Sequence, residues 1–122
     1  MREFAFIDNL RARVRGNDGV VRGIGDDAAI VRFAASEECV VTTDTLVAGV
    51  HFPLDAAPAD IGYKTAAVNL SDLAAMGATP RFCTLALTLP SLDGGYVEPL
   101  IKGLLALLDT HQVALVGGDT TR

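Results

Sequence analysis

Residues 96–119, YVEPLIKGLLALLDTHQVALVGGD, decide the fold of this 122-residue chain. The first part, Tyr96 to His111, is strongly apolar and long enough for a buried helix, and Val113–Val116 is typical of a short buried strand. The stretch before them, Arg81 to Leu89, is rich in Thr, Leu and Cys and predicts another strand. Two strands joined by a helical crossover predict a helix packed on one face of a sheet.

A second long helix precedes this unit. We expect Asp60 to cap it, and we expect it to run to about Met76 and to stop at Gly77. The residues before it, 46–59, contain Gly49, Pro53 and Pro58 and predict a loop. Within the helix, Thr65, Asn69 and Asp72 are spaced at i, i+4 and i+7, so they are expected on one polar face.

The N-terminal third predicts one helix followed by a hairpin. Apolar residues at 4, 7, 10 and 14 favour a helix over residues 3–14. Two runs rich in β-forming residues, 28–33 and 38–44, are joined by a turn near 35–37 and predict the hairpin. The expected fold class is therefore α+β, a single domain (residues 1–122) with a mixed β-sheet and helices packed on one face.

Composition limits the function. The formal net charge of the chain is −5, and its ten Lys and Arg residues are scattered along the sequence. Both properties argue against a nucleic-acid-binding protein, which needs clustered basic residues. No run approaches the ~18 apolar residues of a membrane-spanning helix, so we expect a cytoplasmic protein with no membrane partner. Cys39 and Cys83 lie in apolar runs without a C-x-x-C spacing and are expected to be buried free thiols.

Four short acidic motifs carry the chemical signal of the chain. They are Gly25-Asp26-Asp27, Thr42-Thr43-Asp44-Thr45, Asn69-Leu70-Ser71-Asp72 and Gly117-Gly118-Asp119-Thr120. Carboxylates repel one another unless a cation lies between them, and oxygen ligands of this kind are those that Mg²⁺ prefers. Taken singly, each motif also fits an ordinary turn, strand end or solvated helix face. Taken together, they predict a site for magnesium and phosphate.

Two other nucleotide motifs were weighed against this interpretation. Residues 23–28 match the letters G-x-G-x-x-[GA] of the dinucleotide fingerprint, and Asp44 follows at about the expected distance. That fingerprint needs a helix after its glycines, whereas residues 28–33 favour a strand. The phosphate-binding P-loop pattern G-x-x-x-x-G-K-[ST] does not occur in the sequence.

The motifs resemble those of the thiamine-monophosphate kinase family. This family belongs to an ATP-using superfamily that also contains aminoimidazole ribonucleotide synthetase and selenophosphate synthetase. The resemblance covers nearly the whole chain in the same order, in residues 23–29, 43–52, 68–78 and 117–122.

The resemblance implies transfer of the ATP γ-phosphoryl group to thiamine monophosphate, which gives thiamine diphosphate. It implies Mg²⁺ and ATP as cofactor and co-substrate, and a homodimer that associates through its sheets. The magnesium ligands that it implies are Asp27, Thr42, Thr43, Asp44, Asp72 and Asp119. It further implies Gly118, Asp119 and Asp26 at the nucleotide and His51 at the thiamine substrate. No general acid or base is assigned, because a phosphate nucleophile needs none.

The resemblance also implies the N-terminal domain of the aminoimidazole ribonucleotide synthetase-like fold. We expect the C-terminal domain of the family to be absent, so that the chain is an N-terminal portion and inactive alone. Two alternatives remain open at this point. One is an amidine-forming synthetase of the same superfamily, and the other is a non-catalytic dimerising module.

Overall fold

The structure is a computed structural model that describes residues 2–122. Its elements, in chain order, are α1 (Glu3–Arg13), β1 (Val20–Arg22), β2 (Ile30–Val31), α2 (Pro58–Ala75), β3 (Phe82–Thr88), α3 (Gly94–Thr110) and β4 (Ala114–Thr121). The chain therefore alternates helices and strands in the predicted α-β-β-α-β-α-β order, although the two N-terminal strands are formed by other residues than those expected.

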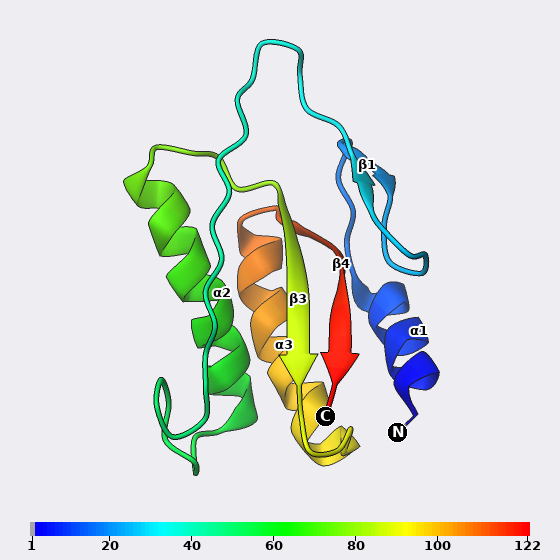
Figure 1. Cartoon of the computed structure of the whole chain (residues 1–122), viewed down its shortest axis with the longest axis vertical. Helices are drawn as coiled ribbons and strands as arrows, with labels where there is room; N and C mark the ends of the chain where they lie inside the picture. The colour runs from blue at the N-terminus through cyan, green and yellow to red at the C-terminus, as the bar shows by residue number, and fades with distance from the viewer. Residues whose placement is uncertain (1) are drawn as a thin grey trace.

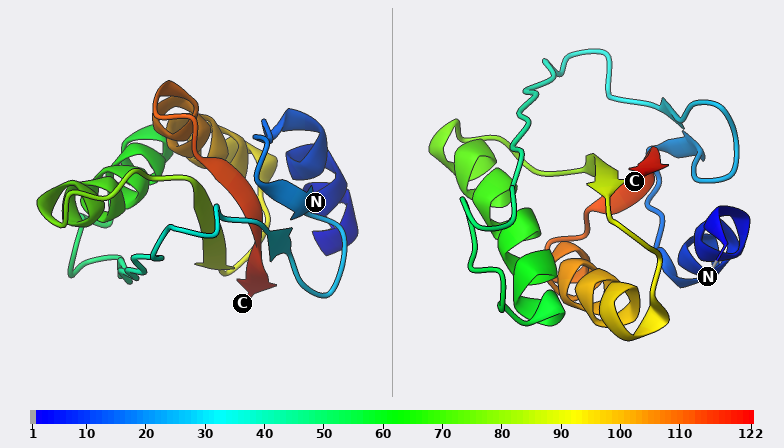
Figure 2. Two further views of the ribbon diagram at one scale, coloured as in Figure 1. Left: turned by 90° about the horizontal axis from the view of Figure 1, so that it is seen from above. Right: turned by 60° about the horizontal axis from the view of Figure 1, so that its bottom comes forward.

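The β3 and β4 strands form a parallel pair, and α3 is the crossover between them. The helices α2 and α3 lie on one face of this pair, while the long segment before α2 passes on the other side (Figures 1 and 2). A second, antiparallel pair is formed by β1 and β2. The single mixed sheet that we predicted is therefore divided into two small sheets, because β1 contacts β4 without joining its ladder.

The core is built on α3. Val97 and Ile101 are each 1% exposed, and Leu104 and Leu108 continue the same face at intervals of three and four residues. The helix begins at Gly94 and not at the predicted Tyr96, because Asp93 caps it: its Oδ1 accepts a hydrogen bond from the Gly95 N–H at 3.1 Å.

The start of α2 also differs from the prediction. Ala57 is the N-cap residue and Pro58 opens the helix, so Asp60 lies in the first turn instead of capping it. Proline suits this position because its fixed φ is helical and its missing N–H would have no partner there. The predicted stop is confirmed, since α2 ends at Ala75 and Gly77 follows with φ +68°.

The predicted hairpin between residues 28–33 and 38–44 is wrong. In the structure β2 pairs with β1, through Val20 opposite Val31, and residues 38–44 belong to no strand of the described chain. The N–H of Arg32 donates to the carbonyl of Gly19 at 2.8 Å, so the earlier chain already supplies the partner of β2. The later segment runs across to α2 instead.

The end of β4 is longer than predicted. We expected a strand over residues 113–116 followed by a glycine turn, but β4 continues through Gly117-Gly118-Asp119-Thr120 and pairs with β3 as far as Thr88. The pairing skips one residue between Leu115 and Gly117, which is a β-bulge. A Cβ on Gly118 would lie 1.8 Å from the Leu85 carbonyl oxygen, so glycine allows this close pairing.

Both cysteines are free thiols, as expected, but only one is sheltered. Cys83 packs against the core, and its burial raises the pKa of the thiol to about 12. Cys39 is exposed, contrary to the prediction, because the segment that carries it belongs to no sheet of the described chain.

Among the helices of residues 2–122, none combines the length and the apolar composition needed to cross a membrane.

The helices α2 and α3 touch through their backbones. A Cβ on Gly103 would lie 2.0 Å from the carbonyl oxygen of Ala59, and one on Gly62 would lie 1.9 Å from that of Leu100. These distances are far below any van der Waals contact, so each helix requires a glycine at the crossing.

We expect Gly103→Ala to destabilise the protein by about 1–3 kcal/mol, because the added methyl group must push the two helices apart. Gly94→Ala, in the first turn of the same helix, is the matched control, since a Cβ there meets no atom of the described chain within 4 Å. Urea unfolding followed by circular dichroism measures both. Equal midpoints for the two variants would contradict the close contact.

Candidate functional site

Two of the predicted acids, Asp44 and Asp72, lie together in the structure. They border a shallow hollow of about 400 Å³ that is lined by Asp44, Ala67, Val68, Ser71 and Asp72. Partial loss of water raises the pKa of Asp44, and the neighbouring Asp72 carboxylate raises it further through its charge and a hydrogen bond. Two carboxyl groups from distant parts of the chain therefore repel each other here.

The helical contribution to this hollow comes from one face of α2. Residues 67, 68, 71 and 72 are spaced as neighbours on a helix surface. The polar face that we predicted is only partly present. Thr65 Oγ1 donates to the Ile61 carbonyl at 2.7 Å, and Asn69 Nδ2 donates to the Thr65 carbonyl at 2.9 Å. Both side chains thus bond back to their own helix, and Asp72 remains to face the hollow.

The other side of the hollow comes from the extended segment before α2. Asp44 lies on it, directly after Thr42 and Thr43; Thr42 is half-buried, whereas Thr43 and Asp44 are exposed. This segment passes beside α2 (Figure 1). The two predicted threonines are therefore on the same stretch of chain as Asp44, within two residues of it.

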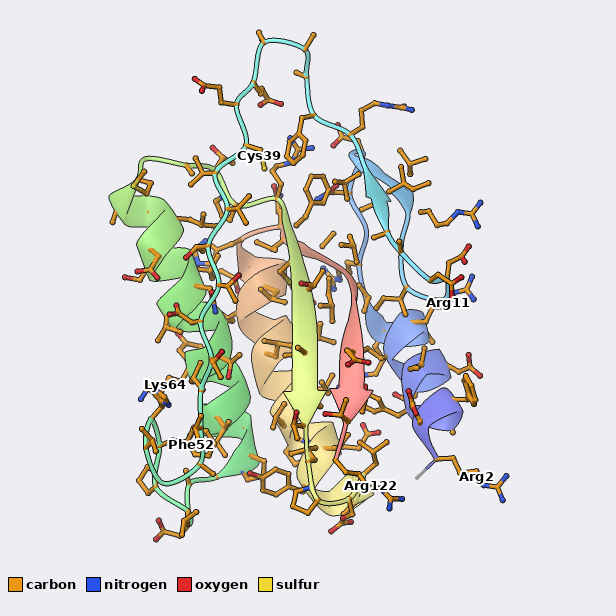
Figure 3. All side chains as sticks on the ribbon, in the orientation of Figure 1. Arg2, Arg11, Cys39, Phe52, Lys64 and Arg122 are labelled. Carbon is orange, nitrogen blue, oxygen red and sulfur yellow. The ribbon has the colours of Figure 1, made fainter. Side chains whose placement is uncertain are left out.

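The loop between β1 and β2 carries Asp26 and Asp27. Asp26 Oδ2 forms an ion pair with Arg22 Nη1 at 2.6 Å, and its Oδ1 accepts a hydrogen bond from the Asp27 N–H at 2.8 Å. The Asp27 N–H bond, with the Arg22 bond second, lowers the pKa of Asp26. Figure 3 shows Arg11 of α1 beside this loop, against Gly25. Arg22 was not assigned from the sequence, because an i, i+4 spacing indicates a contact on a helix and these residues lie on a strand and a loop.

Gly118 and Asp119 lie in the second half of β4. They pair with Leu85 and Ala86 of β3, and both are exposed. Asp119 is therefore presented on the open surface of the parallel pair, away from the apolar residues that pack on the core.

His51 lies in a tight loop between Asp44 and the start of α2. Its Nδ1 accepts a hydrogen bond from the Val47 N–H at 2.8 Å, and its carbonyl accepts one from Lys64 Nζ. Phe52 anchors the loop on the core; Figure 3 shows Lys64 of α2 close to it. With Nδ1 as the acceptor, the neutral imidazole carries its proton on Nε2. A positive charge on His51 would lower the pKa of Asp44.

A larger hollow of about 650 Å³ lies at the carboxyl ends of β3 and β4, where parallel sheets commonly bind ligands. Its lining is Arg2, Glu3, Leu89, Ser91, Leu92, Asp93, Thr120, Thr121 and Arg122. None of these residues was assigned from the sequence. We predicted that the strand ends near residue 116, so no signal in the sequence placed residues 120–122 at the end of a strand. In the structure β4 continues as far as this hollow.

The predicted site residues are thus only partly brought together. Asp44 and Asp72 meet, while Asp26, Asp27 and Asp119 lie on the hairpin loop and on β4. Residues 2–122 contain no group of three or more His, Cys, Asp or Glu placed to hold a metal ion.

Comparison with known proteins decides the family. The model of the AIR synthase related protein N-terminal domain matches residues 25–122. The chain belongs to this family. Thiamine-monophosphate kinases are among its relatives: the proteins of Salmonella typhimurium and Escherichia coli K12 are each 50% identical to it over 121 residues. The Bacillus subtilis protein of the same name is 39% identical over 122 residues.

A solved structure agrees with these matches. The crystal structure of thiamine-monophosphate kinase from Stenotrophomonas maltophilia K279a superposes on the whole chain with a TM-score of 0.87 and 56% sequence identity. The chain spans 39% of the length of that protein and 37% of the length of the Salmonella and Escherichia coli K12 proteins. The matches to the latter two include 98% of this chain. The resemblance read from the motifs is thereby confirmed, and so is the AIR synthase-like domain.

We expect Asp44→Asn to raise the midpoint of thermal unfolding at pH 7 in the absence of metal. The raised pKa of Asp44 means that the folded chain binds its proton more tightly than the unfolded chain, so ionisation of Asp44 costs stability as the pH rises above about 3.8. The difference in midpoint between Asp44→Asn and the unmodified protein should therefore disappear below that pH, where Asp44 is protonated in both the folded and the unfolded chain. Scanning calorimetry at pH 3 and pH 7 measures it.

Asp55→Asn is the control for a general loss of negative charge. Asp55 is exposed in the loop before α2, and no ion pair of the described residues includes it. If Asp55→Asn raised the midpoint as much as Asp44→Asn, repulsion within the acid pair would not be the cause.

Proposed function

We propose that the protein carrying these residues transfers the γ-phosphoryl group of ATP to thiamine monophosphate and forms thiamine diphosphate. The observation that carries this proposal is the meeting of Asp44 and Asp72 in a chain that is 50% identical to proteins named thiamine-monophosphate kinase. Since this chain spans 37–39% of those relatives, we assign it the N-terminal, nucleotide-side portion of the enzyme.

The acids suit magnesium. Asp44 and Asp72 lie close enough to repel, and a divalent cation removes that repulsion. We propose that the ligands are drawn from Asp27, Thr42, Thr43, Asp44, Asp72 and Asp119. When bound, Mg²⁺ ions neutralise the phosphate charge that develops during phosphoryl transfer.

The remaining assigned residues would bind the two substrates. Gly118 and Asp119 lie on the exposed half of β4, and Asp26 lies on the hairpin loop; we assign these three to the nucleotide. His51 presents its Nε2–H as a hydrogen-bond donor, because Nδ1 is engaged by Val47, and we assign it to thiamine monophosphate. We place the reaction in the cytoplasm.

The side chains position charge and move no proton. The substrate's phosphate oxygen is already ionised at neutral pH and needs no general base, so positioning and charge neutralisation carry the reaction.

We expect Asp72→Asn, in the protein at full length, to lower the turnover of thiamine monophosphate by at least about a hundredfold, as removal of a charge-neutralising group commonly does. Formation of thiamine diphosphate from Mg²⁺, ATP and thiamine monophosphate, followed by chromatography, measures it. Asp109→Asn is the matched control, because Asp109 lies on α3 and pairs with Arg15 at 3.8 Å.

The identity of the product separates this proposal from its alternatives. ATP hydrolysis by the unmodified protein without thiamine diphosphate would favour another reaction of the superfamily, such as amidine formation. No nucleotide turnover at all, with near-normal folding, would favour a non-catalytic module.

We further propose that the protein is a homodimer, on the grounds of its uncovered surface. A globular protein of 12.8 kDa exposes about 6,300 Å², whereas this chain exposes 7945 Å². The difference of about 1,600 Å² leaves room both for the rest of the full-length protein and for a second copy, since one partner loses ~800 Å² in a standard interface. The extended segment contributes Val41, which is 81% exposed and lies in no strand of the described chain.

We expect Val41→Asp to weaken dimerisation at least about tenfold, because a charge would replace an exposed apolar side chain on the surface that we assign to the interface. Sedimentation velocity over a range of concentrations measures the dissociation constant. Leu54→Asp, in the loop before α2, is the control, because Leu54 is 83% exposed and lies outside the strands of the described chain. A monomeric unmodified protein at micromolar concentration would contradict the dimer.

A further inference from the structure

One carbonyl oxygen joins the beginnings of three strands. The carbonyl of Arg81, directly before β3, accepts a hydrogen bond from Asn17 Nδ2 at 2.9 Å and another from the Ala114 N–H at 2.9 Å. Ala114 opens β4, and Asn17 lies in the turn that leads into β1. This oxygen therefore ties the β1–β2 hairpin to the parallel pair. We name Asn17, Asp18, Gly19, Arg81 and Phe82 the hairpin clamp.

The clamp is tightly packed around Gly19. A Cβ on Gly19 would lie 2.5 Å from Phe82 Cζ and 3.0 Å from the Arg32 carbonyl oxygen. The ring of Phe82 also meets the ring of Phe33 edge to face, with centroids 5.4 Å apart. Since Phe33 follows β2 and Gly19 precedes β1, both ends of the hairpin rest on Phe82.

The members of the clamp contribute unequally. Asn17 serves twice, because its Oδ1 accepts from the Gly19 N–H at 3.0 Å while its Nδ2 reaches Arg81. Asp18 pairs with Arg81 Nη2 at 3.1 Å, but the side chain of Asp18 is 96% exposed. Ion pairs of this kind add little. The position of the hairpin therefore depends on Asn17 and Gly19 more than on Asp18.

The β1–β2 hairpin carries Asp26 and Asp27, which we assign to the nucleotide and to magnesium. Arg22 of β1 holds Asp26 at 2.6 Å, so the Asp26–Asp27 loop moves with β1. β1 contacts β4, the strand that carries Gly118 and Asp119, and the views of Figures 1 and 2 agree that the hairpin lies beside it. The clamp is thus the hydrogen-bonded link between two strands whose acids are assigned to the same Mg–ATP.

We propose that Asn17 and Gly19 are positioning residues for the magnesium nucleotide. They set where the Asp26–Asp27 loop lies relative to Asp119, and they touch neither the metal nor the nucleotide. A binding site requires its groups within about 0.5 Å of the productive geometry, so a small displacement of the hairpin lowers affinity. This inference rests on the function proposed above.

The test is calorimetric titration of the full-length protein with ATP in excess Mg²⁺, well below the unfolding temperature. Asn17→Ser retains a hydroxyl that can accept from the Gly19 N–H but is too short to reach the Arg81 carbonyl. Gly19→Ala forces the hairpin away from Phe82. We expect each variant to bind Mg–ATP about tenfold more weakly than the unmodified protein, as loss of an outer supporting contact commonly does.

Two controls separate positioning from general stability. Asp18→Asn removes the exposed clamp ion pair, and Glu98→Gln removes the 2.8 Å ion pair between Arg13 of α1 and Glu98 of α3. Both should leave the affinity for Mg–ATP unchanged, and Glu98→Gln should do so even if it lowers the melting temperature. A purely structural role would instead make affinity follow melting temperature in all four variants, which would overturn the proposal.

The outcomes also separate this inference from the proposed function. If the unmodified protein binds Mg–ATP and Asn17→Ser and Gly19→Ala bind it equally well, the positioning role is refuted while the kinase proposal stands. If the unmodified protein does not bind Mg–ATP, both are refuted. Circular dichroism shows whether each variant is folded, and the two substitutions act on different contacts of the clamp.

Discussion

The backbone contact between α2 and α3 is the constraint on which the arrangement of this chain depends. Gly62 and Gly103 leave no room for a methyl group between the helices. Because α3 buries its apolar face under β3 and β4, α2 is held to the sheet largely through this contact. Asp72 lies near the end of α2, so this contact also sets where Asp72 lies relative to the sheet.

The acid pair lowers the stability of the metal-free chain that presents it. Loss of hydration, and then the charge of the neighbouring Asp72, raise the pKa of Asp44. Carboxylates that served folding would be paired with a cation, as Asp26 is with Arg22. Asp26 is thus neutralised by a neighbouring cation, whereas Asp44 faces a second carboxylate, and it is the latter arrangement to which we assign Mg²⁺.

The sequence predicted the helices well because their signals are local. Apolar spacing located α1, a long apolar run located α3, and the residues flanking α2 located that helix, whose end Gly77 marked. The starts of α2 and α3 were less accurate, since Pro58 and Asp93 compete with other plausible first residues. The hairpin failed for a different reason: residues 38–44 have strand-forming composition, but composition does not say which partner is free, and β1 pairs with β2 instead.

The acids of the site could be named from the sequence, but their arrangement could not. Spacing along the chain does not reveal that Asp26 is engaged by Arg22, or that Thr65 and Asn69 bond back to their helix. Gly118 shows why a motif alone is ambiguous. Glycine there allows β4 to pair closely with β3 at Leu85, which is reason enough for glycine without any ligand. The same absence of a side chain leaves the open face of β4 uncovered beside Asp119, so the requirement of the sheet and the proposed requirement of the nucleotide select the same residue.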